Sequence, residues 1–416
     1  MENRKFDVIV LGAGIVGVSA AIHAQARGRS VAIVDRNPDV AGETSFGNAG
    51  IIQSEAIFPY MFPHSLGEIV KAAANQDPRA EIRHFTLPKI APALWRYFLA
   101  STPDGRAKSA AAMRGLVGAA KGEHIALAQA SGGMRYFRDT GWIKVFRTAY
   151  GEGQVEEEIA ELTPYGIATR RLDRAALNAL EPGIGEHALG GVHFPDPLST
   201  SDPHALANSY ADLFKRRGGR ILVGDAMSFD EEADGWSVGA GGARLHARDA
   251  IVALGPWSAA LVRRFGYRLP FFVKRGYHMH YAPTGVAPTR PVLDMEKGYV
   301  LTPMARGLRL TTGAEFAPLE DAPSPRHLDR IEPFAREMFS LGERLDPQPW
   351  MGRRPCLPDM LPIIGPATRH KGLWFDFAHQ HLGLTLGPAS GRMLADMIAG
   401  TETFVDARGF SMARFG

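Results

Sequence analysis

The chain has 416 residues, of which 45% are hydrophobic and 22% charged, so it is long enough for two domains with sizeable cores. The charges of its 47 basic and 44 acidic residues nearly balance. The sequence contains no Lys/Arg cluster of the kind that a nucleic-acid site needs. The single cysteine, Cys356, excludes a disulfide within the chain and favours a reducing compartment. A predicted strand begins at residue 6 and no apolar run reaches about 18 residues, so we expect neither a signal peptide nor a spanning helix. We expect a cytoplasmic protein, and the sequence is compatible with peripheral attachment to the inner face of the membrane and with a homo-oligomer.

Residues 6–35, FDVIVLGAGIVGVSAAIHAQARGRSVAIVD, predict a strand, a helix and a second strand over 6–11, 15–27 and 30–34. Gly12, Gly14 and Gly17 have the G-x-G-x-x-G spacing, and Asp35 follows about twenty residues later, which is typical of a dinucleotide site. Gly12 permits the tight turn, Gly14 leaves room for a pyrophosphate, and Gly17 allows the helix to pack closely on the strand.

The start of this helix, at Ile15 and Val16, directs free N–H groups and the positive end of the helix dipole toward the phosphates. Asp35 can accept hydrogen bonds from ribose hydroxyls, which favours FAD or NAD over NADP. Arg36 follows directly, and an arginine here can also serve a 2′-phosphate, so this point stays open.

Further elements follow in chain order. The pattern predicts helices over 91–100, 107–130, 173–180, 203–217, 325–341 and 389–399, and strands over 142–146, 220–224, 250–254, 271–281, 299–303, 308–314 and 372–377. Residues 228–249 predict a β-meander, and 41–52 and 379–387 predict glycine-rich turns. A dinucleotide unit at one end and a glycine turn with a helix at the other predict a discontinuous cofactor domain.

Two glycine-rich segments can approach a ligand closely. Thr44, Ser45, Asn48, Ala49 and Gly50 are small residues whose free N–H groups suit a phosphate or a ring edge, although a plain surface loop is the alternative. Gly383, Leu384 and Thr385 open the last helix, so their N–H groups can hold negative charge on a ring, and an unliganded helix end is the alternative. No H-E-x-x-H, paired C-x-x-C or G-x-S-x-G occurs, so a metal or hydrolase site is not expected.

Five ordered motifs resemble one family across essentially the whole chain. They are the fingerprint with Asp35-Arg36, the loop 44–50, the strand end Leu254-Gly255-Pro256-Trp257-Ser258, the run Gly352-Arg353-Arg354-Pro355 with Pro358-Asp359 and Pro362-Ile363-Ile364-Gly365, and the turn His379-Gln380-His381-Leu382-Gly383-Leu384-Thr385. This set resembles the D-amino-acid oxidase/dehydrogenase family of FAD proteins, and is most similar to bacterial D-amino-acid dehydrogenases, including the D-hydroxyproline dehydrogenase branch.

The resemblance implies an α/β protein in which a Rossmann-like FAD domain carries a second, α+β substrate domain built on an antiparallel sheet. We expect residues 1–57, 173–265 and 350–416 to form the FAD domain, and 58–172 and 266–349 to form the cap. Gly255 and Trp257 would lie near the adenine, or would simply form a tight turn with a core tryptophan. Some relatives attach FAD to a cysteine, but Cys356 lacks the matching spacing, so we expect non-covalent FAD.

The implied reaction is FAD-dependent dehydrogenation of a small D-amino or D-imino acid, such as a D-proline or D-hydroxyproline type, by hydride transfer from Cα to flavin N5. The electron acceptor would be oxygen, a quinone or an electron carrier. The alternatives are an oxidase of glycine, sarcosine or an opine-type secondary amine, a flavin subunit of a heteromeric complex with no activity alone, and an NAD-linked enzyme.

Substrate binding calls for an arginine against the carboxylate. Arg354 matches the arginine of the family's G-L-R-P pattern, but Arg353 stands where that pattern has leucine, so the choice between them stays open, and a structural ion pair is the alternative for Arg354. Arg275 is a weaker candidate. Tyr299, Tyr277, His379 and His381 are the other candidates, each with a structural role as the alternative.

Overall fold

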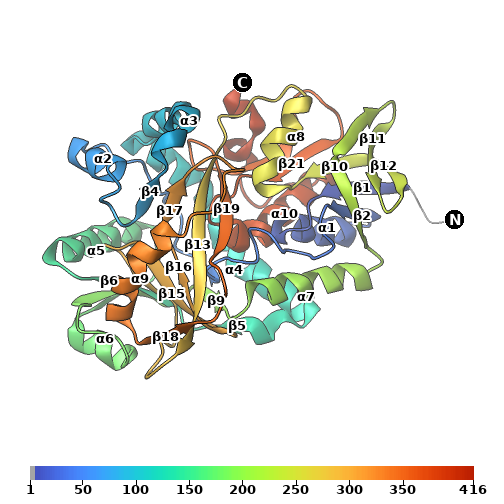
Figure 1. The fold of residues 1–416 in the computed structure, drawn as a ribbon. Helices are drawn as coiled ribbons and strands as arrows, with labels where there is room; N and C mark the ends of the chain where they lie inside the picture. Colours follow the sequence, from blue (N-terminus) through green and yellow to red (C-terminus); the bar gives the residue numbers. More distant parts are fainter. Residues whose placement is uncertain (1–4) are drawn as a thin grey trace.

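The computed structural model describes residues 5–416, which form two large β-sheets side by side with helices on their outer faces (Figure 1). One sheet has seven strands and the other eleven. A small three-stranded sheet lies with them and consists of β3 (Ile51–Ile52), β9 (Leu198–Thr200) and β5 (Phe137–Arg138). Among the described residues, none of the helices is both long and apolar enough to cross a bilayer.

The seven-stranded sheet is the predicted dinucleotide fold. Its strands are β1 (Lys5–Leu11), β2 (Val31–Asp35), β10 (Arg220–Glu232), β11 (Gly235–Ala240), β12 (Ala243–Val252), β20 (Ile363–Pro366) and β21 (Leu373–Phe377). β1 pairs in parallel with β2 on one side and with β12 on the other, β10 extends this set beyond β2, and β21 extends it beyond β12. The far ends of β10 and β12 are joined through β11 as an antiparallel meander, which confirms the prediction for 228–249.

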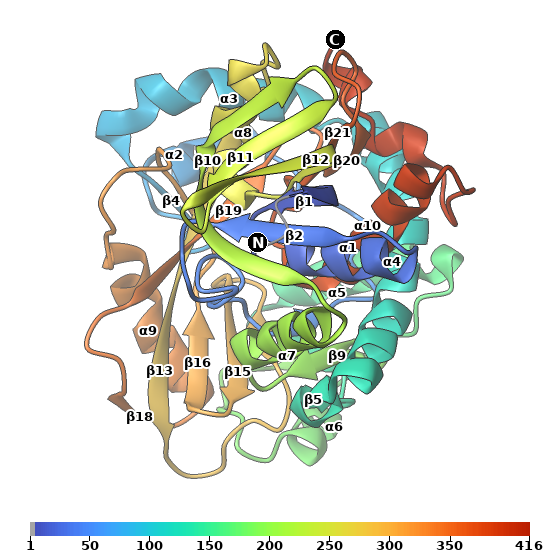
Figure 2. The same ribbon diagram turned by 90° about the vertical axis from the view of Figure 1, so that its right-hand side faces the viewer.

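Four helices cover one face of this sheet and share its hydrophobic core (Figure 2). They are α1 (Ile15–Ala26), α4 (Pro103–Ser131), α7 (Pro203–Arg216) and α10 (Gly383–Ala399). α1 and α10 pack closely because Gly391 of α10 lies against the backbone of α1. A Cβ on Gly391 would lie 2.6 Å from the Ala20 nitrogen. The other face carries the meander, α8 (Ser258–Arg264) and an aromatic cluster that includes the stacked pair Phe229 and Trp236.

α10 begins six residues earlier than predicted, at Gly383 instead of residue 389. Gly387 and Pro388 indicate a turn in the sequence, but proline is tolerated here because its missing N–H is compensated. Pro388 cannot donate to the Leu384 carbonyl one turn earlier, and the buried His124 Nε2 of α4 lies 2.7 Å from that oxygen and donates to it instead.

The eleven-stranded sheet is mainly antiparallel and centres on β13 (Phe272–Pro283). β13 pairs with β16 (Gly307–Thr311) and β17 (Ala314–Phe316) on one edge, and with β18 (Leu341–Arg344) and β19 (Trp350–Cys356) on the other. The sheet continues through β15 (Tyr299–Met304), β14 (Val292–Asp294), β6 (Trp142–Phe146) and β8 (Gly190–Phe194) to β7 (Arg170–Leu172). One face packs on α6 (Arg174–Leu180) and α9 (Arg326–Met338), and the opposite face turns toward the first sheet.

The α/β class with a cofactor fold and a second, antiparallel-sheet unit is therefore confirmed. The sequence patterns did not indicate α2 (Leu66–Ala73), α5 (Ala149–Leu162), β8 or β19. Two of these strands, β8 and β19, pair into the eleven-stranded sheet although the sequence assigned them to the FAD domain. The division of the chain into domains stays a prediction.

Lowering the pH from 7 to 5 is expected to destabilise the fold, because burial lowers the pKa of several histidines that stay neutral when folded. The pKa of His23 and of His381 falls to about 3, that of His124 and of His327 to about 4, and that of His278 to about 2. In the unfolded chain the same histidines have the usual pKa of about 6.5, so they take up protons as the pH falls below that value. The free energy of unfolding is therefore fully present at neutral pH, and each histidine lowers it by about 2 kcal/mol at pH 5. Urea unfolding at the two pH values measures this loss. An unchanged free energy of unfolding would refute it, and His124→Gln should shrink the difference by one histidine's share.

Candidate active site

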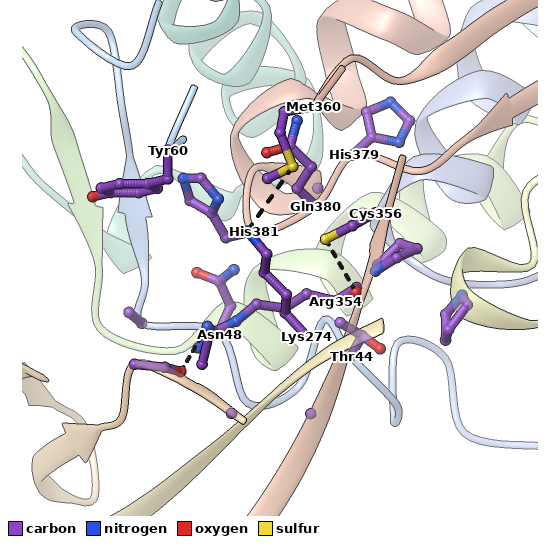
Figure 3. Close-up of a pocket in the computed structure, with 18 of the residues that line it drawn as sticks. Thr44, Asn48, Tyr60, Lys274, Arg354, Cys356, Met360, His379, Gln380 and His381 are labelled. Carbon is purple, nitrogen blue, oxygen red and sulfur yellow. Dashed lines mark hydrogen bonds between the residues drawn. The ribbon is translucent and has the colours of Figure 1, made fainter. Parts of the chain in front are cut away.

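A single large cavity of about 1490 Å³ connects the glycine turn after β1 with the inner face of the eleven-stranded sheet. At one end it is lined by the carboxyl ends of β1 and β2, which is where ligands bind in parallel α/β sheets. At the other end it is lined by β13 and β19 and by the turn before α10 (Figure 3). Segments distant in the sequence therefore enclose one elongated space.

The three fingerprint glycines differ in what surrounds them: Gly12 and Gly17 face backbone closely, and Gly14 faces open space. Gly12 has a φ of +108°, and a Cβ there would lie 2.4 Å from the Ala253 carbonyl oxygen. A Cβ on Gly17 would lie 2.0 Å from the Gly12 oxygen, so Gly17 permits the helix to pack against the turn without lining the cavity. A Cβ on Gly14 would meet nothing closer than Ser45 Oγ at 3.6 Å, so this glycine leaves open space on the cavity wall beside Ile15 and Val16.

Asp35, at the end of β2, lines the cavity and holds the turn together. Its carboxylate accepts hydrogen bonds from the N–H of Ala13, at 2.7 Å, and of Asn37, at 2.9 Å. Arg36 forms an ion pair with Glu43 and lies over the ring of Trp257, 4.1 Å from its centroid. This arrangement places an acid where a ribose would lie, with Gly255 and Trp257 beside it.

The loop 44–50 crosses the middle of the cavity and is fixed by the second sheet. Thr44, Ser45, Asn48 and Ala49 line the space. Arg309 of β16 donates to the carbonyl oxygen of Asn48 at 2.6 Å, and Thr302 Oγ1 donates to that of Ala49 at 3.0 Å. Gly50 does not line the cavity, and its φ of +79° instead turns the chain into β3 (Ile51–Ile52).

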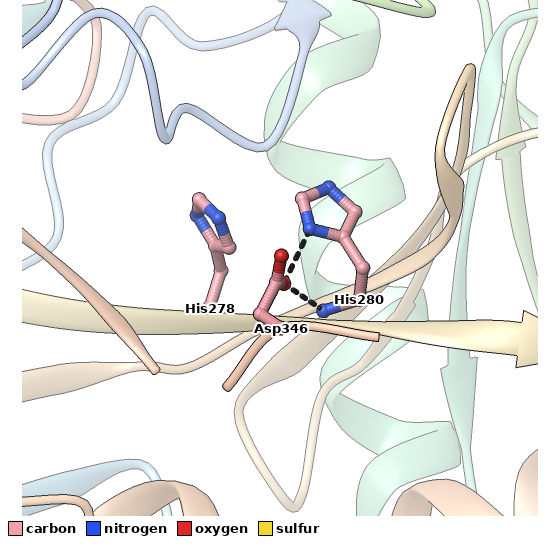
Figure 4. A group of neighbouring side chains, drawn as sticks. All are labelled: His278, His280 and Asp346. Atoms are coloured by element: carbon pink, nitrogen blue, oxygen red, sulfur yellow. Dashed lines mark hydrogen bonds and ion pairs between the residues drawn. The ribbon is translucent and has the colours of Figure 1, made fainter. Parts of the chain in front are cut away.

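Arg309 is itself held by a group of side chains, the buried His278 and His280 and the half-buried Asp346 (Figure 4). Arg309 Nε donates to His280 Nε2 at 3.0 Å, so His280 carries its proton on Nδ1 and donates to Asp346 Oδ2 at 2.7 Å. The ligand atoms of the three lie within 4.8 Å of one another, as in a metal site. However, both His280 nitrogens are used within the protein and Arg306 also pairs with Asp346. The group is therefore explained as support for the loop.

Arg354 and Arg353 lie on opposite faces of β19, and of the two only Arg354 lines the cavity. Arg354 lines the cavity and donates to the carbonyl oxygens of Gly313 and Thr312, at 2.8 and 3.0 Å. Gly276 of β13 gives it room, since a Cβ there would lie 2.3 Å from its guanidinium. Arg353 does not line the cavity and donates to the Leu319 carbonyl.

Arg275 and Tyr299 lie away from the ligand space, whereas Tyr277 lines it. The fully buried Arg275 pairs with Glu315, and the Tyr277 hydroxyl donates to the same carboxylate at 2.6 Å. Tyr299 is buried in the core behind the sheet, where its hydroxyl donates to the Phe334 carbonyl of α9. Strand alternation gives the reason: Gly298 and Val300 line the cavity, so Tyr299 faces the other way. The geometry does not support a substrate role for either tyrosine.

The turn before α10 brings both predicted histidines to the cavity. His379 Nε2 lies 3.2 Å from the buried carboxylate of Asp376, whose pKa is raised by burial. The His381 ring contacts that of Tyr60 at a tilt of 50°, with ring centroids 5.2 Å apart. Burial, then the charges of Arg354, Lys274 and Lys144, lower the pKa of His381 to about 3, so its imidazole is neutral.

α10 points its N-terminus at the same space through Gly383 and Leu384. Thr385 lies behind them: its hydroxyl donates to the Ile51 carbonyl and accepts from the Gln53 N–H, which ties the helix to β3. Thr385 therefore supports the site without lining it.

Several cavity residues carried no signal in the sequence. Lys274 of β13, Tyr60, Lys144 of β6 and Glu55 all line the cavity. Lys144 pairs with Glu158 of α5, and burial raises the pKa of the Glu55 carboxyl. For Lys274 alone the sequence offered a cue. It lies two residues before Gly276 in the predicted strand, and strand alternation places both residues on the same face of the sheet.

The residues present fit an FAD molecule. The ADP half matches the glycine turn, the open wall at Gly14 and Asp35. At the other end, Gln380 Oε1 is buried on the cavity wall without a hydrogen-bond partner among the described residues. This group, with the α10 N-terminus, would hold the ring, whose oxidised form accepts two electrons.

Comparison with known proteins agrees with this geometry. The family model described as FAD dependent oxidoreductase matches residues 7–397, and the chain belongs to this family. It is 30% identical over 420 residues to a D-amino acid dehydrogenase from Granulibacter bethesdensis, which covers 98% of this chain and 99% of that one. It is also 30% identical over 428 residues to one from Sinorhizobium medicae, covering 98% and 100%.

Solved structures share the fold at lower identity. Glycine oxidase from Geobacillus kaustophilus superposes with a TM-score of 0.75 at 20% identity, covering 99% of each chain. L-proline dehydrogenase from P. horikoshii gives the same TM-score, 0.75, at 16% identity, covering 99% of this chain and 98% of that one.

Proposed function

We propose that the protein is an FAD-dependent dehydrogenase or oxidase that converts the Cα–N single bond of a small D-amino or D-imino acid to C=N, the two electrons leaving with the Cα hydrogen as hydride and the nitrogen losing a proton. The observation that carries this proposal is Arg354, a cation on the cavity wall that donates to two backbone carbonyls and to no carboxylate of the described residues. The carboxylate of a bound substrate would supply the anionic partner that the Arg354 guanidinium lacks. The planar guanidinium can donate two parallel hydrogen bonds to such a carboxylate.

The relatives support the same class. The curated proteins that match over almost their full length are named D-amino acid dehydrogenases. Within this class, a cyclic substrate of the D-proline or D-hydroxyproline type is compatible with a reaction that needs a nitrogen bonded to Cα. The product would be an imine, which water converts to the oxo acid when the nitrogen is primary.

The chain's own residues prepare the substrate. FAD, when bound, supplies the electron acceptor for the Cα–H bond. Arg354 fixes the carboxylate, which sets where Cα lies. The cations that lower the pKa of His381 also disfavour a protonated substrate amine nearby, so the nitrogen is held in the neutral form that oxidation needs. Neutral His381 can accept a hydrogen bond from that amine.

Product analysis tests this proposal. The FAD-loaded protein would be mixed with D-amino acids, D-proline and D-hydroxyproline and a redox dye, and the imine or oxo acid would be trapped. We expect dye reduction matched by product for D-enantiomers, and much less for L-enantiomers. Activity with NAD in place of the flavin would contradict the proposal. Bound FAD without turnover of any substrate would indicate a non-catalytic flavin subunit, and exclusive turnover of sarcosine or glycine would indicate a secondary-amine oxidase.

The FAD is proposed to be held without a covalent bond. Cys356 is fully buried, burial raises the pKa of its thiol, and its Sγ lies against the Arg354 carbonyl. A protonated thiol is a poor nucleophile. Acid precipitation of the yellow protein should therefore leave the flavin in the supernatant and a colourless pellet. A pellet that stays yellow after washing would show covalent attachment.

A further inference from the structure

Two cations stand side by side on the inner wall of the cavity. Lys274 of β13 and Arg354 of β19 are direct partners in the antiparallel register, so their side chains leave the same face of the sheet. Both line the cavity, and Figure 3 shows them adjacent, near His381 and Met360. Like charges directly opposite one another destabilise a sheet, so this pair needs an explanation.

Neither cation has a carboxylate partner among residues 5–416. Lys274 is only 9% exposed, and its amine donates to the Tyr97 hydroxyl at 2.9 Å and lies 4.0 Å from Met360 Sδ. The ring of Tyr97 lies 4.2 Å from the same nitrogen. An ammonium group has three donors, so at least one donor is free to face the cavity.

Two other buried cations of the same sheet have acidic partners. Arg275, one residue along β13 and on the opposite face, pairs with Glu315, and Lys144 pairs with Glu158. A third, Arg309 of β16, lies outside the cavity and donates to backbone carbonyls and to His280. Lys274 and Arg354 instead stand beside each other in the ligand space without a carboxylate among residues 5–416. An anion bound between them would remove both the mutual repulsion and the unpaired buried charge.

We propose that this pair selects a substrate with two carboxylates, that is, a D-amino acid whose side chain ends in a second carboxylate. This inference rests on the proposed function and specifies its substrate class. The planar fork of Arg354 suits one carboxylate as a bidentate partner, and the compact charge of Lys274 takes the other. A monocarboxylate leaves one of the two cations unpaired.

Binding of non-reacting anions tests the pair without turnover. The FAD-loaded protein would be titrated with malonate and succinate, and with acetate and propionate, following the flavin difference spectrum and the melting temperature. We expect the dianions to bind at least about tenfold more tightly than the monoanions. Lys274→Met, which keeps the length and apolar contacts of the side chain, should weaken dianion binding by roughly tenfold to a hundredfold and leave monoanions within about threefold.

Turnover gives the second measurement. The ratio of kcat/KM for D-glutamate over D-glutamine, and for D-aspartate over D-asparagine, should exceed about tenfold in the native protein, fall to near one in Lys274→Met and be largely retained in Lys274→Arg. Lys274→Gln serves as a second neutral variant if the methionine protein does not retain FAD.

The outcomes separate the two proposals. If neutral D-amino acids are oxidised but the dicarboxylates are no better, and Lys274→Met changes both alike, the inference is overturned while the proposed function stands. If Lys274→Met slows only reoxidation by oxygen and leaves dianion binding unchanged, the inference is also overturned. If malonate binds through Lys274 but no amino acid is turned over, the anion pair stands and the proposed function fails.

Discussion

Replacing Arg354 with methionine is expected to lower kcat/KM by about a thousandfold, equal to about 4 kcal/mol of lost transition-state binding. The change leaves the substrate carboxylate in a buried space without its bidentate partner, and it releases Cα from its fixed position. The protein should keep its fold, because within residues 5–416 the guanidinium donates only to the Gly313 and Thr312 carbonyls, and it should keep its FAD. Steady-state kinetics with the best D-substrate, and the flavin content of the purified variant, measure both effects.

Arg353→Met is the matched control, because Arg353 is the neighbouring arginine of the same strand and faces away from the cavity. We expect kcat/KM to change less than about fivefold in this variant, as for a residue that makes no substrate contact. Arg354→Lys should be nearly as inactive as the methionine variant, since an ammonium group cannot form the bidentate pair. Equal losses in Arg353→Met and Arg354→Met would show that the carboxylate is not bound at Arg354.

Gly14→Ala is expected to weaken FAD binding at least about a hundredfold while leaving the FAD-free protein as stable as the native one. The new Cβ would meet only Ser45 Oγ, at 3.6 Å, so the polypeptide itself has room for it. With FAD bound, the same methyl group would occupy the space that the glycine leaves for the pyrophosphate. Fluorescence titration of the FAD-free protein with FAD, together with its melting temperature, measures the two quantities separately.

Gly12→Ala and Gly17→Ala provide the contrast. A Cβ on Gly12 or Gly17 would lie 2.4 or 2.0 Å from a backbone oxygen, and Gly12 also has a left-handed φ. These variants should lose stability, by about 1–3 kcal/mol or more, before any ligand is added. If Gly14→Ala melts as early as they do, or binds FAD normally, the assignment of Gly14 to the pyrophosphate wall is wrong.

The sequence predicted the fold of the cofactor half well because its signals are local. The strand, the glycine spacing and Asp35 lie within residues 6–35, and the structure places Gly12, Gly14 and Asp35 on one cavity wall. The last helix was predicted too short because Gly387 and Pro388 are turn residues in isolation. Only the distant His124 shows why α10 passes through them.

The substrate half was harder to predict because it depends on which face of a strand each residue occupies. Arg353 and Arg354 are adjacent, so alternation requires them to point in opposite directions, but the sequence does not say which one faces the ligand. The same ambiguity made Tyr299 attractive, although its neighbours line the cavity. Lys274 was missed because its importance comes from its neighbour on β19, Arg354. These two residues are paired in the sheet but lie far apart in the chain.

The central claim is that one cavity brings a D-amino acid and FAD together so that electrons pass from Cα to the flavin. It is tested most directly by mixing the FAD-loaded protein with D- and L-enantiomers of the same amino acids, without oxygen, and recording the flavin absorption in a stopped-flow spectrometer. We predict rapid, saturable bleaching of the oxidised-flavin band by at least one D-enantiomer, slow or no bleaching by its L-enantiomer, and loss of the D-specific phase in Arg354→Met. A flavin that stays oxidised with every D-amino and D-imino acid would contradict the account.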